Sequence, residues 1–120
     1  MKKLSKDEKK ARVNHLREIA KAYEEGVDPE QIAKDFPALV ARFSIRNCFL
    51  ILAQKETATE CAGFKDWATV GRRVCKGSKG LAILVPMRVK DSSDNDKLLF
   101  TWRYVFDIAD TEVVAEKVSA

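Results

Sequence analysis

The sequence predicts an α+β domain in which N-terminal helices pack on a small antiparallel β-sheet or hairpin. Three observations support this fold class. Apolar residues recur at helical spacing in the first half of the chain, between recognisable helix start and stop signals. Two later stretches alternate in the manner of half-buried strands. The length of 120 residues suits one domain with its own core, so residues 1–120 are expected to form a single unit.

Two helices are expected in the N-terminal third. Ser5 and Glu8 have the spacing of a capping box that opens the first helix, and Gly26 fits its end. A second helix is expected to begin at Pro29, because proline at the first helical position loses no hydrogen bond. It should be short, because the proline after Phe36 disfavours a helical conformation of that phenylalanine.

A third helix is expected to begin after Ser44, which can cap it, and to contain the apolar run 48–53. That run is apolar on every side, which is typical of a central, buried helix. Asn47 and Gln54 lie two turns apart on one stripe of this helix. Two interpretations stay open for their amides: they bond neighbouring backbone, as buried amides require, or they face a bound base or phosphate.

Two alternating stretches, residues 81–90 and 98–106, predict the strands of a hairpin around the polar loop DSSDND. The faces of these strands carry Leu81, Ile83, Val85, Met87 and Val89 on the first, and Leu98, Phe100, Trp102, Tyr104 and Phe106 on the second. The aromatic face has two interpretations, core or platform for nucleic-acid bases. We expect core, because an alternating apolar face usually packs on helices.

Charge is unevenly distributed along the chain. The formal net charge is only +4, yet the segment from Ala62 to Lys90 contains many cations and a single acid, Asp66. The cations of this segment are Lys65, Arg72, Arg73, Lys76, Lys79, Arg88 and Lys90. A surface that serves solubility alone mixes its signs more evenly, so the centre of the chain is expected to meet an anion.

Several functional classes are disfavoured by composition. The cysteines Cys48, Cys61 and Cys75 are odd in number and far apart, and His15 is the only histidine, so neither disulfides nor a metal site is expected. No apolar run could span a bilayer and no secretion signal is recognisable, which predicts a cytoplasmic protein without membrane contact. Because H-E-x-x-H, G-x-S-x-G and Walker motifs are missing, we expect no enzymatic activity and no cofactor.

The stretch GRRVCKGSKG, residues 71–80, is the strongest binding signal in the sequence. Its glycines permit positive φ and close backbone approach, so that amide N–H groups can point at an anion. Its arginines can fork onto phosphate oxygens while its lysines act as mobile charges. Phe64 and Trp67 lie just upstream, and rings beside cations are what single-stranded nucleic acid requires. The alternative is a tight turn with a solvated charge run.

The same stretch belongs to a longer pattern. From Arg42 to Glu112 the chain resembles the N-terminal domain of ArdC-type antirestriction proteins, which plasmids and phages carry. The matching positions are Phe43, Ser44, Asn47, Ala62, Gly63, Phe64, Trp67, Gly71, Arg72, Val74, Lys76, Gly77, Lys79, Gly80, Pro86, Val105, Phe106, Asp107 and Thr111. Because these motifs keep the family's order over most of the chain, the resemblance is specific.

The resemblance implies a domain associated with single-stranded DNA binding. In full-length family members a zinc metalloprotease-like domain follows, but this sequence lacks H-E-x-x-H, so no proteolytic role is expected of it. We therefore expect a non-catalytic single-stranded DNA-binding domain that serves antirestriction. The expected contacts are Arg72, Arg73, Lys76 and Lys79 for phosphates, Trp67 and Phe64 for bases, and Asn47 and Arg46 as further candidates from the third helix.

A function of a different class also fits the basic charge. The chain could instead be a protein-binding inhibitor of a host restriction or CRISPR nuclease, whose basic surface occupies a nucleic-acid groove or meets an acidic face. An acidic mimic of DNA is disfavoured by the positive net charge. The two classes are separable, because a DNA binder shifts an oligonucleotide without any partner, whereas an inhibitor co-purifies with a nuclease.

Overall fold

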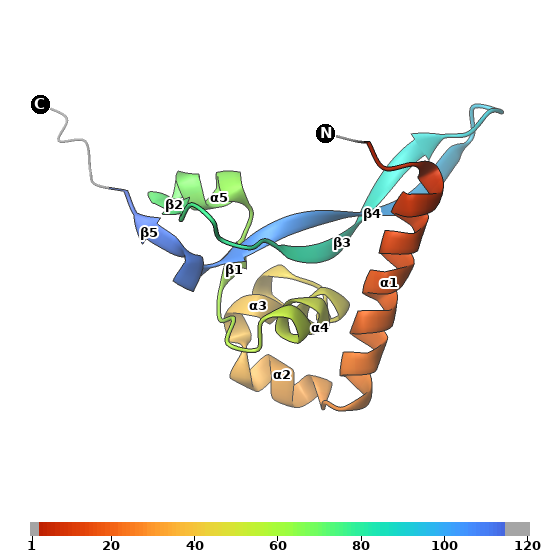
Figure 1. Cartoon of the computed structure of the whole chain (residues 1–120). Helices are drawn as coiled ribbons and strands as arrows, with labels where there is room; N and C mark the ends of the chain where they lie inside the picture. The colour runs from red at the N-terminus through yellow and green to blue at the C-terminus, as the bar shows by residue number, and fades with distance from the viewer. Residues whose placement is uncertain (1–2, 115–120) are drawn as a thin grey trace, which may run out of the picture.

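A computed structural model of the protein describes residues 3–114 and confirms the α+β fold class (Figure 1). The elements in chain order are α1 (Lys6–Glu25), α2 (Pro29–Asp35), α3 (Pro37–Arg42), α4 (Ile45–Gln54), β1 (Cys61–Ala62), α5 (Phe64–Thr69), β2 (Arg72–Val74), β3 (Leu81–Lys90), β4 (Asp96–Asp107), the 3-10 turn η1 (Ile108–Asp110) and β5 (Thr111–Val113). One antiparallel sheet has the strand order β1-β4-β3, and β2 pairs separately with β5. None of the helices in this part of the chain is long and apolar enough to cross a membrane.

The expected helix signals act where the sequence places them. The Ser5 hydroxyl accepts the Glu8 amide at 3.1 Å, and the Glu8 carboxylate accepts the Ser5 amide at 3.0 Å, so the capping box is confirmed. The bond from the Ser5 amide lowers the pKa of Glu8, because it stabilises the charged carboxylate. Pro29 opens α2, and the chain turns at Phe36 into the separate helix α3.

The predicted hairpin is confirmed. β3 and β4 pair continuously, from Leu81 opposite Val105 to Lys90 opposite Asp96. At the tip, the Asp91 carboxylate accepts the backbone amides of the two loop residues Ser93 and Asn95, at 2.8 and 3.0 Å. The loop is thus closed by its own first residue, as aspartate commonly does in turns.

Burial along the hairpin departs from the expected alternation. All four residues from Leu81 to Leu84 are buried, because α1 covers one face of this part and α2, α3 and α4 cover the other. Residues 86–100, called the arm, are nearly all exposed, and the tip of the hairpin extends past the helices (Figure 1). The aromatic face of β4 is therefore core only in part, because Trp102 packs on the core whereas Phe100 and Tyr104 are exposed, which corrects the expectation that this face is core.

The helix α4 lies along the free edge of β3 and pairs with its backbone through two side-chain amides. Asn47 donates to the Leu84 carbonyl and accepts the Leu84 amide, both at 2.9 Å. Gln54 does the same at Ala82, donating at 2.8 Å and accepting at 2.9 Å. Because β3 is an edge strand, these N–H and C=O groups have no partner on a neighbouring strand. The side-chain amides of Asn47 and Gln54 bond them instead.

This pairing bears on the two interpretations of the amide stripe. Asn47 and Gln54 bond neighbouring backbone, as the first interpretation expects, and the contact of Asn47 with nucleic acid stays a prediction. Both polar ends of the Asn47 side chain bond Leu84, which holds this amide against the backbone of β3.

We predict that Asn47→Ala lowers the free energy of unfolding by about 1–3 kcal/mol, because it leaves backbone groups of Leu84 buried without partners. Denaturant titration followed by circular dichroism measures the change. Asn14→Ala is the matched control, since Asn14 is exposed on α1 and its loss should change stability by no more than about 0.5 kcal/mol. Equal effects of the two substitutions would contradict the role of Asn47.

Candidate nucleic-acid interface

The basic glycine-rich stretch is held in place by a small sheet. β2 pairs with β5, which sets Arg72 opposite Val113 and Val74 opposite Thr111. The chain then continues into a tight turn, in which the Cys75 amide donates to the Asp110 carbonyl at 2.8 Å. Gly71 and Gly77 have φ of 77° and 86°, so the predicted need for glycine is met at both positions.

The two arginines of the stretch bond to the neighbouring strand. Arg72 donates from Nε to the Thr111 hydroxyl at 2.7 Å and from a terminal nitrogen to the Thr111 carbonyl at 3.3 Å. Arg73 forms an exposed ion pair with Glu112 at 2.6 Å. Arg72 is therefore engaged in joining β2 to β5, whereas an exposed pair such as Arg73–Glu112 is weak enough to be exchanged for a phosphate.

The two lysines of the stretch are available to an anion. Lys76 and Lys79 are both exposed in the turn between β2 and β3. Among residues 3–114, no carboxylate forms an ion pair with either of them. The turn thus presents two uncompensated positive charges, and hydrogen bonds fix the backbone that carries them.

The last glycine of the stretch is required by close packing. A Cβ atom at Gly80 would lie 2.8 Å from the Cβ of Tyr104, closer than two carbon atoms can approach without displacement. The end of the basic turn therefore rests directly on the aromatic face of β4. Lys79, the neighbour of Gly80, is the turn residue nearest in sequence to this contact.

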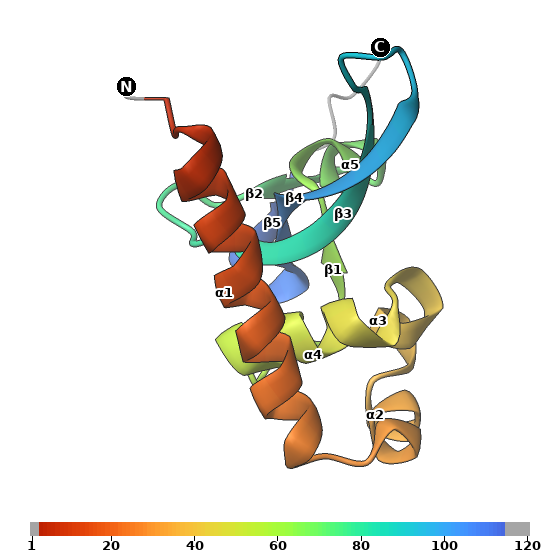
Figure 2. The same ribbon diagram turned by 90° about the vertical axis from the view of Figure 1, so that its right-hand side faces the viewer.

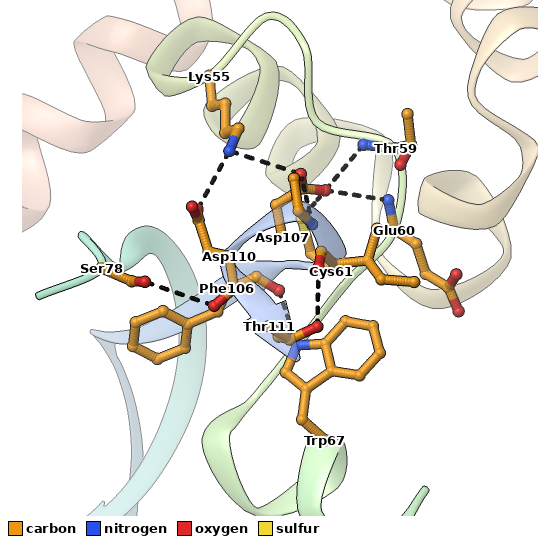
Figure 3. A network of polar contacts seen from close by, with 12 residues as sticks. Lys55, Thr59, Glu60, Cys61, Trp67, Ser78, Phe106, Asp107, Asp110 and Thr111 are labelled. Carbon is orange, nitrogen blue, oxygen red and sulfur yellow. Dashed lines mark hydrogen bonds and ion pairs between the residues drawn. The ribbon is translucent and has the colours of Figure 1, made fainter. Parts of the chain in front are cut away.

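Trp67 is part of the core, which corrects its assignment as a stacking residue. Its side chain is only 4% exposed, and its Nε1 donates to the Phe106 carbonyl at 2.8 Å (Figure 3). A base cannot stack on a ring that the end of β4 already covers. Phe64, which begins the same short helix α5, is 63% exposed and keeps its predicted accessibility.

A buried carboxylate organises the chain beneath the basic turn (Figure 3). Asp107 is 1% exposed and accepts the amides of Thr59, Glu60 and Ala109 at 3.0 to 3.3 Å. Lys55 lies 3.5 Å from this carboxylate and bonds Asp110 at 3.1 Å. The hydrogen bond to Asp110 raises the pKa of Lys55, and these contacts join the end of α4 to the end of β4.

This polar cluster does not have the composition of a metal site. Within residues 3–114, no group of three or more histidine, cysteine or acidic side chains is arranged to hold a metal ion. Burial raises the pKa of the neighbouring Cys61 thiol to about 12, so this sulfur is a neutral thiol rather than a thiolate ligand. Lys55 and backbone amides already compensate the charge of Asp107.

A second set of cations lies on α1 and was not singled out from the sequence. The Arg12 guanidinium carbon lies 5.1 Å from the centre of the Trp102 ring, and that of Arg17 lies 5.2 Å from the centre of the Phe100 ring. Arg46, a predicted contact residue, lines a surface hollow together with Arg17 and Lys21, at the start of α4 (Figure 2 shows α1 and α4). Arg46 thus faces cations of α1, whereas the neighbouring Asn47 side chain bonds β3.

Comparison with known protein families finds one that matches nearly the whole chain. The model of the N-terminal domain of anti-restriction factor ArdC matches residues 6–118. The chain belongs to this family. The match confirms the resemblance found in the motifs and extends it over α1, which the motif comparison did not include.

Two solved structures of the ArdC antirestriction protein from plasmid R388 are similar to this member of the ArdC family. The metal-free structure has a TM-score of 0.50 and 17% identity, covering 88% of this chain and 43% of that protein. The Mn(II)-bound structure has a TM-score of 0.54 and 16% identity, covering 87% and 41%. At these identities the likeness shows the fold, and the chain spans about two fifths of the R388 protein. No curated protein sequence matches this chain.

We predict that Trp67→Ala lowers the free energy of unfolding by about 3–5 kcal/mol, the usual cost of removing a core tryptophan. Phe64→Ala, an aromatic truncation in the same helix, should change stability by about 0.5 kcal/mol or less because its ring is exposed. Thermal and denaturant melts of both variants measure this difference. A Trp67→Ala variant as stable as Phe64→Ala would restore the interpretation of Trp67 as a surface ring.

We also predict that Cys75 reacts with a thiol reagent well before the other two cysteines. Cys48 and Cys61 are buried, which raises the pKa of both thiols, whereas Cys75 is partly exposed. Mass spectrometry after timed alkylation at mildly alkaline pH should find the label first at Cys75, and Cys75→Ser should remove this fast phase. Early labelling of Cys61 would show that the cluster around Asp107 opens readily.

Proposed function

We propose that this domain binds single-stranded DNA without catalysing a reaction on it, as the DNA-contacting part of an antirestriction protein of a plasmid or phage. The observation that carries the proposal is the turn between β2 and β3, which presents Lys76 and Lys79 with no acidic partner among the described residues. Membership of the ArdC N-terminal family supports the antirestriction role.

The form of the turn suits a phosphate backbone. Lysine ammonium groups are compact, mobile charges that follow a flexible chain of phosphates without demanding one geometry. Release of the counterions condensed on the DNA then drives binding, independently of base sequence. Because β5 and Asp110 hold the backbone of the turn, little conformational entropy is lost there on binding.

A preference for single strands over duplex follows from the accessible rings of the domain. Phe64 is exposed on α5, and Phe100 and Tyr104 are exposed on β4. A ring can stack only on a base that is not already stacked in a duplex, so exposed rings in a domain that also presents free cations favour an unpaired strand.

We predict that Lys76→Ala and Lys79→Ala each reduce the slope of log affinity against log salt by about 0.7, the value for one phosphate contact on a single strand. Fluorescence anisotropy of a labelled oligothymidylate, titrated at several salt concentrations, measures the slope. Lys34→Ala removes the same charge from the end of α2 and should leave the slope unchanged. Identical salt slopes for all three variants would show that the turn does not contact the DNA.

The exposed arm favours a second candidate function, inhibition of a host restriction or CRISPR nuclease by direct protein contact. Met87 and Leu99 are exposed apolar side chains that lie opposite each other on one face of the arm, and such residues in a group are typical of protein interfaces. If the folded domain leaves the oligothymidylate unbound even at low salt, this second function replaces the first. Co-purification with a host nuclease then becomes the relevant assay.

A further inference from the structure

The face of the hairpin next to the basic turn carries a row of three aromatic rings. Phe100, Trp102 and Tyr104 alternate along β4, so they point to the same side of the sheet. Phe100 is 39% exposed and Tyr104 45% exposed, while Trp102 is partly buried against α1. This aromatic row is anchored in the core at its centre and open to solvent at both ends.

Two arginines of α1 lie over the aromatic row. Arg12 sits 5.1 Å from the centre of the Trp102 ring and 5.9 Å from that of Tyr104, and it also donates to the Tyr104 hydroxyl. Arg17 sits 5.2 Å from the centre of the Phe100 ring. In the described part of the chain, neither arginine forms an ion pair. Both guanidinium groups therefore keep their charge available for a phosphate.

The aromatic row is continuous with the basic turn. Gly80 touches Tyr104 so closely that a Cβ atom would not fit between them, and Lys79 precedes this contact directly. At the other end, Arg17 shares a surface hollow with Arg46, Lys21 and one acid, Glu24, so cations outnumber acids there. Cations thus lie at both ends of the aromatic row and over its rings. A single strand offers phosphates for such cations and unpaired bases for such rings.

From this continuity we infer that the bases of the bound strand stack on the aromatic row, with Arg12 and Arg17 holding the phosphates beside it. The inference rests on the proposed single-stranded DNA binding and assigns the base-stacking surface to β4 and α1 instead of α5. A planar guanidinium over a ring is itself a weakly held stack. A base can replace it on the ring while the arginine turns to the neighbouring phosphate.

The decisive experiment maps where the bases lie. An oligothymidylate that carries 5-bromodeoxyuridine is bound to the unmodified protein, irradiated, and the adducts are located by tryptic mass spectrometry. Residues 98–103 form one tryptic peptide, with Phe100 and Trp102, and residues 56–65 form another, with Phe64. We expect adducts in 98–103 and in the following peptide with Tyr104. Adducts confined to 56–65 would overturn the inference and leave the proposed function standing.

A pair of matched variants tests the same point in solution. Phe100→Ala should weaken oligothymidylate binding by about 5- to 150-fold, the scale of one lost base stack, with an unchanged salt slope because no charge is removed. Phe64→Ala, also an exposed phenylalanine, should alter affinity by less than about twofold on this inference. Equal losses in the two variants would overturn it.

The role of Arg17 is tested with one substitution that keeps its positive charge and one that removes it. Arg17→Lys retains the cation but loses the planar group, so it should preserve the salt slope and weaken affinity, whereas Arg17→Gln should also reduce the slope by about 0.7. Thermal melts accompany every variant. If none of the proteins, including the unmodified one, binds oligothymidylate, the proposed function itself fails. If binding persists undiminished in Phe100→Ala and in both Arg17 variants, only this inference fails.

Discussion

The edge pairing between α4 and β3 is the constraint on which the remaining architecture depends. A hairpin alone leaves the N–H and C=O groups at one edge of β3 open, and Asn47 and Gln54 occupy these groups at Leu84 and Ala82. With α4 fixed along this edge, the two faces of the hairpin base are covered by different sets of helices. α1 covers one, and the cluster of α2, α3 and α4 covers the other.

The same arrangement explains how a flexible-looking glycine-rich stretch acquires a defined position. Lys55 follows α4 directly and reaches Asp107 and Asp110 at the end of β4. Asp110 in turn receives the Cys75 amide at the start of the basic turn. One chain of contacts therefore connects the buried helix, the hairpin and the turn, so that the lysines are presented by a fixed backbone and not by a loose loop.

The sequence predicted local features well and long-range ones poorly. The capping box at Ser5 and the hairpin around Asp91 depend on neighbouring residues, and both are found. The pairing of β2 with β5 joins segments about forty residues apart through only three residues each, which leaves no periodic signal. Trp67 was misassigned because residue order shows a ring beside cations but not that the end of β4 covers it. Arg12 was missed because an exposed arginine on a helix is ordinary until its aromatic partners are known.

The contact between Arg12 and Tyr104 joins residues 92 positions apart, which has a consequence for the order of events during synthesis. A ribosome releases α1 and the basic turn early, whereas the rings of β4 emerge only near the end of the described chain. A nascent chain that ends within β3 therefore carries the arginines and lysines without any ring of the aromatic row. On the proposed function, such a chain has the ionic contacts but lacks the stacking surface of the aromatic row until β4 arrives and docks on α1.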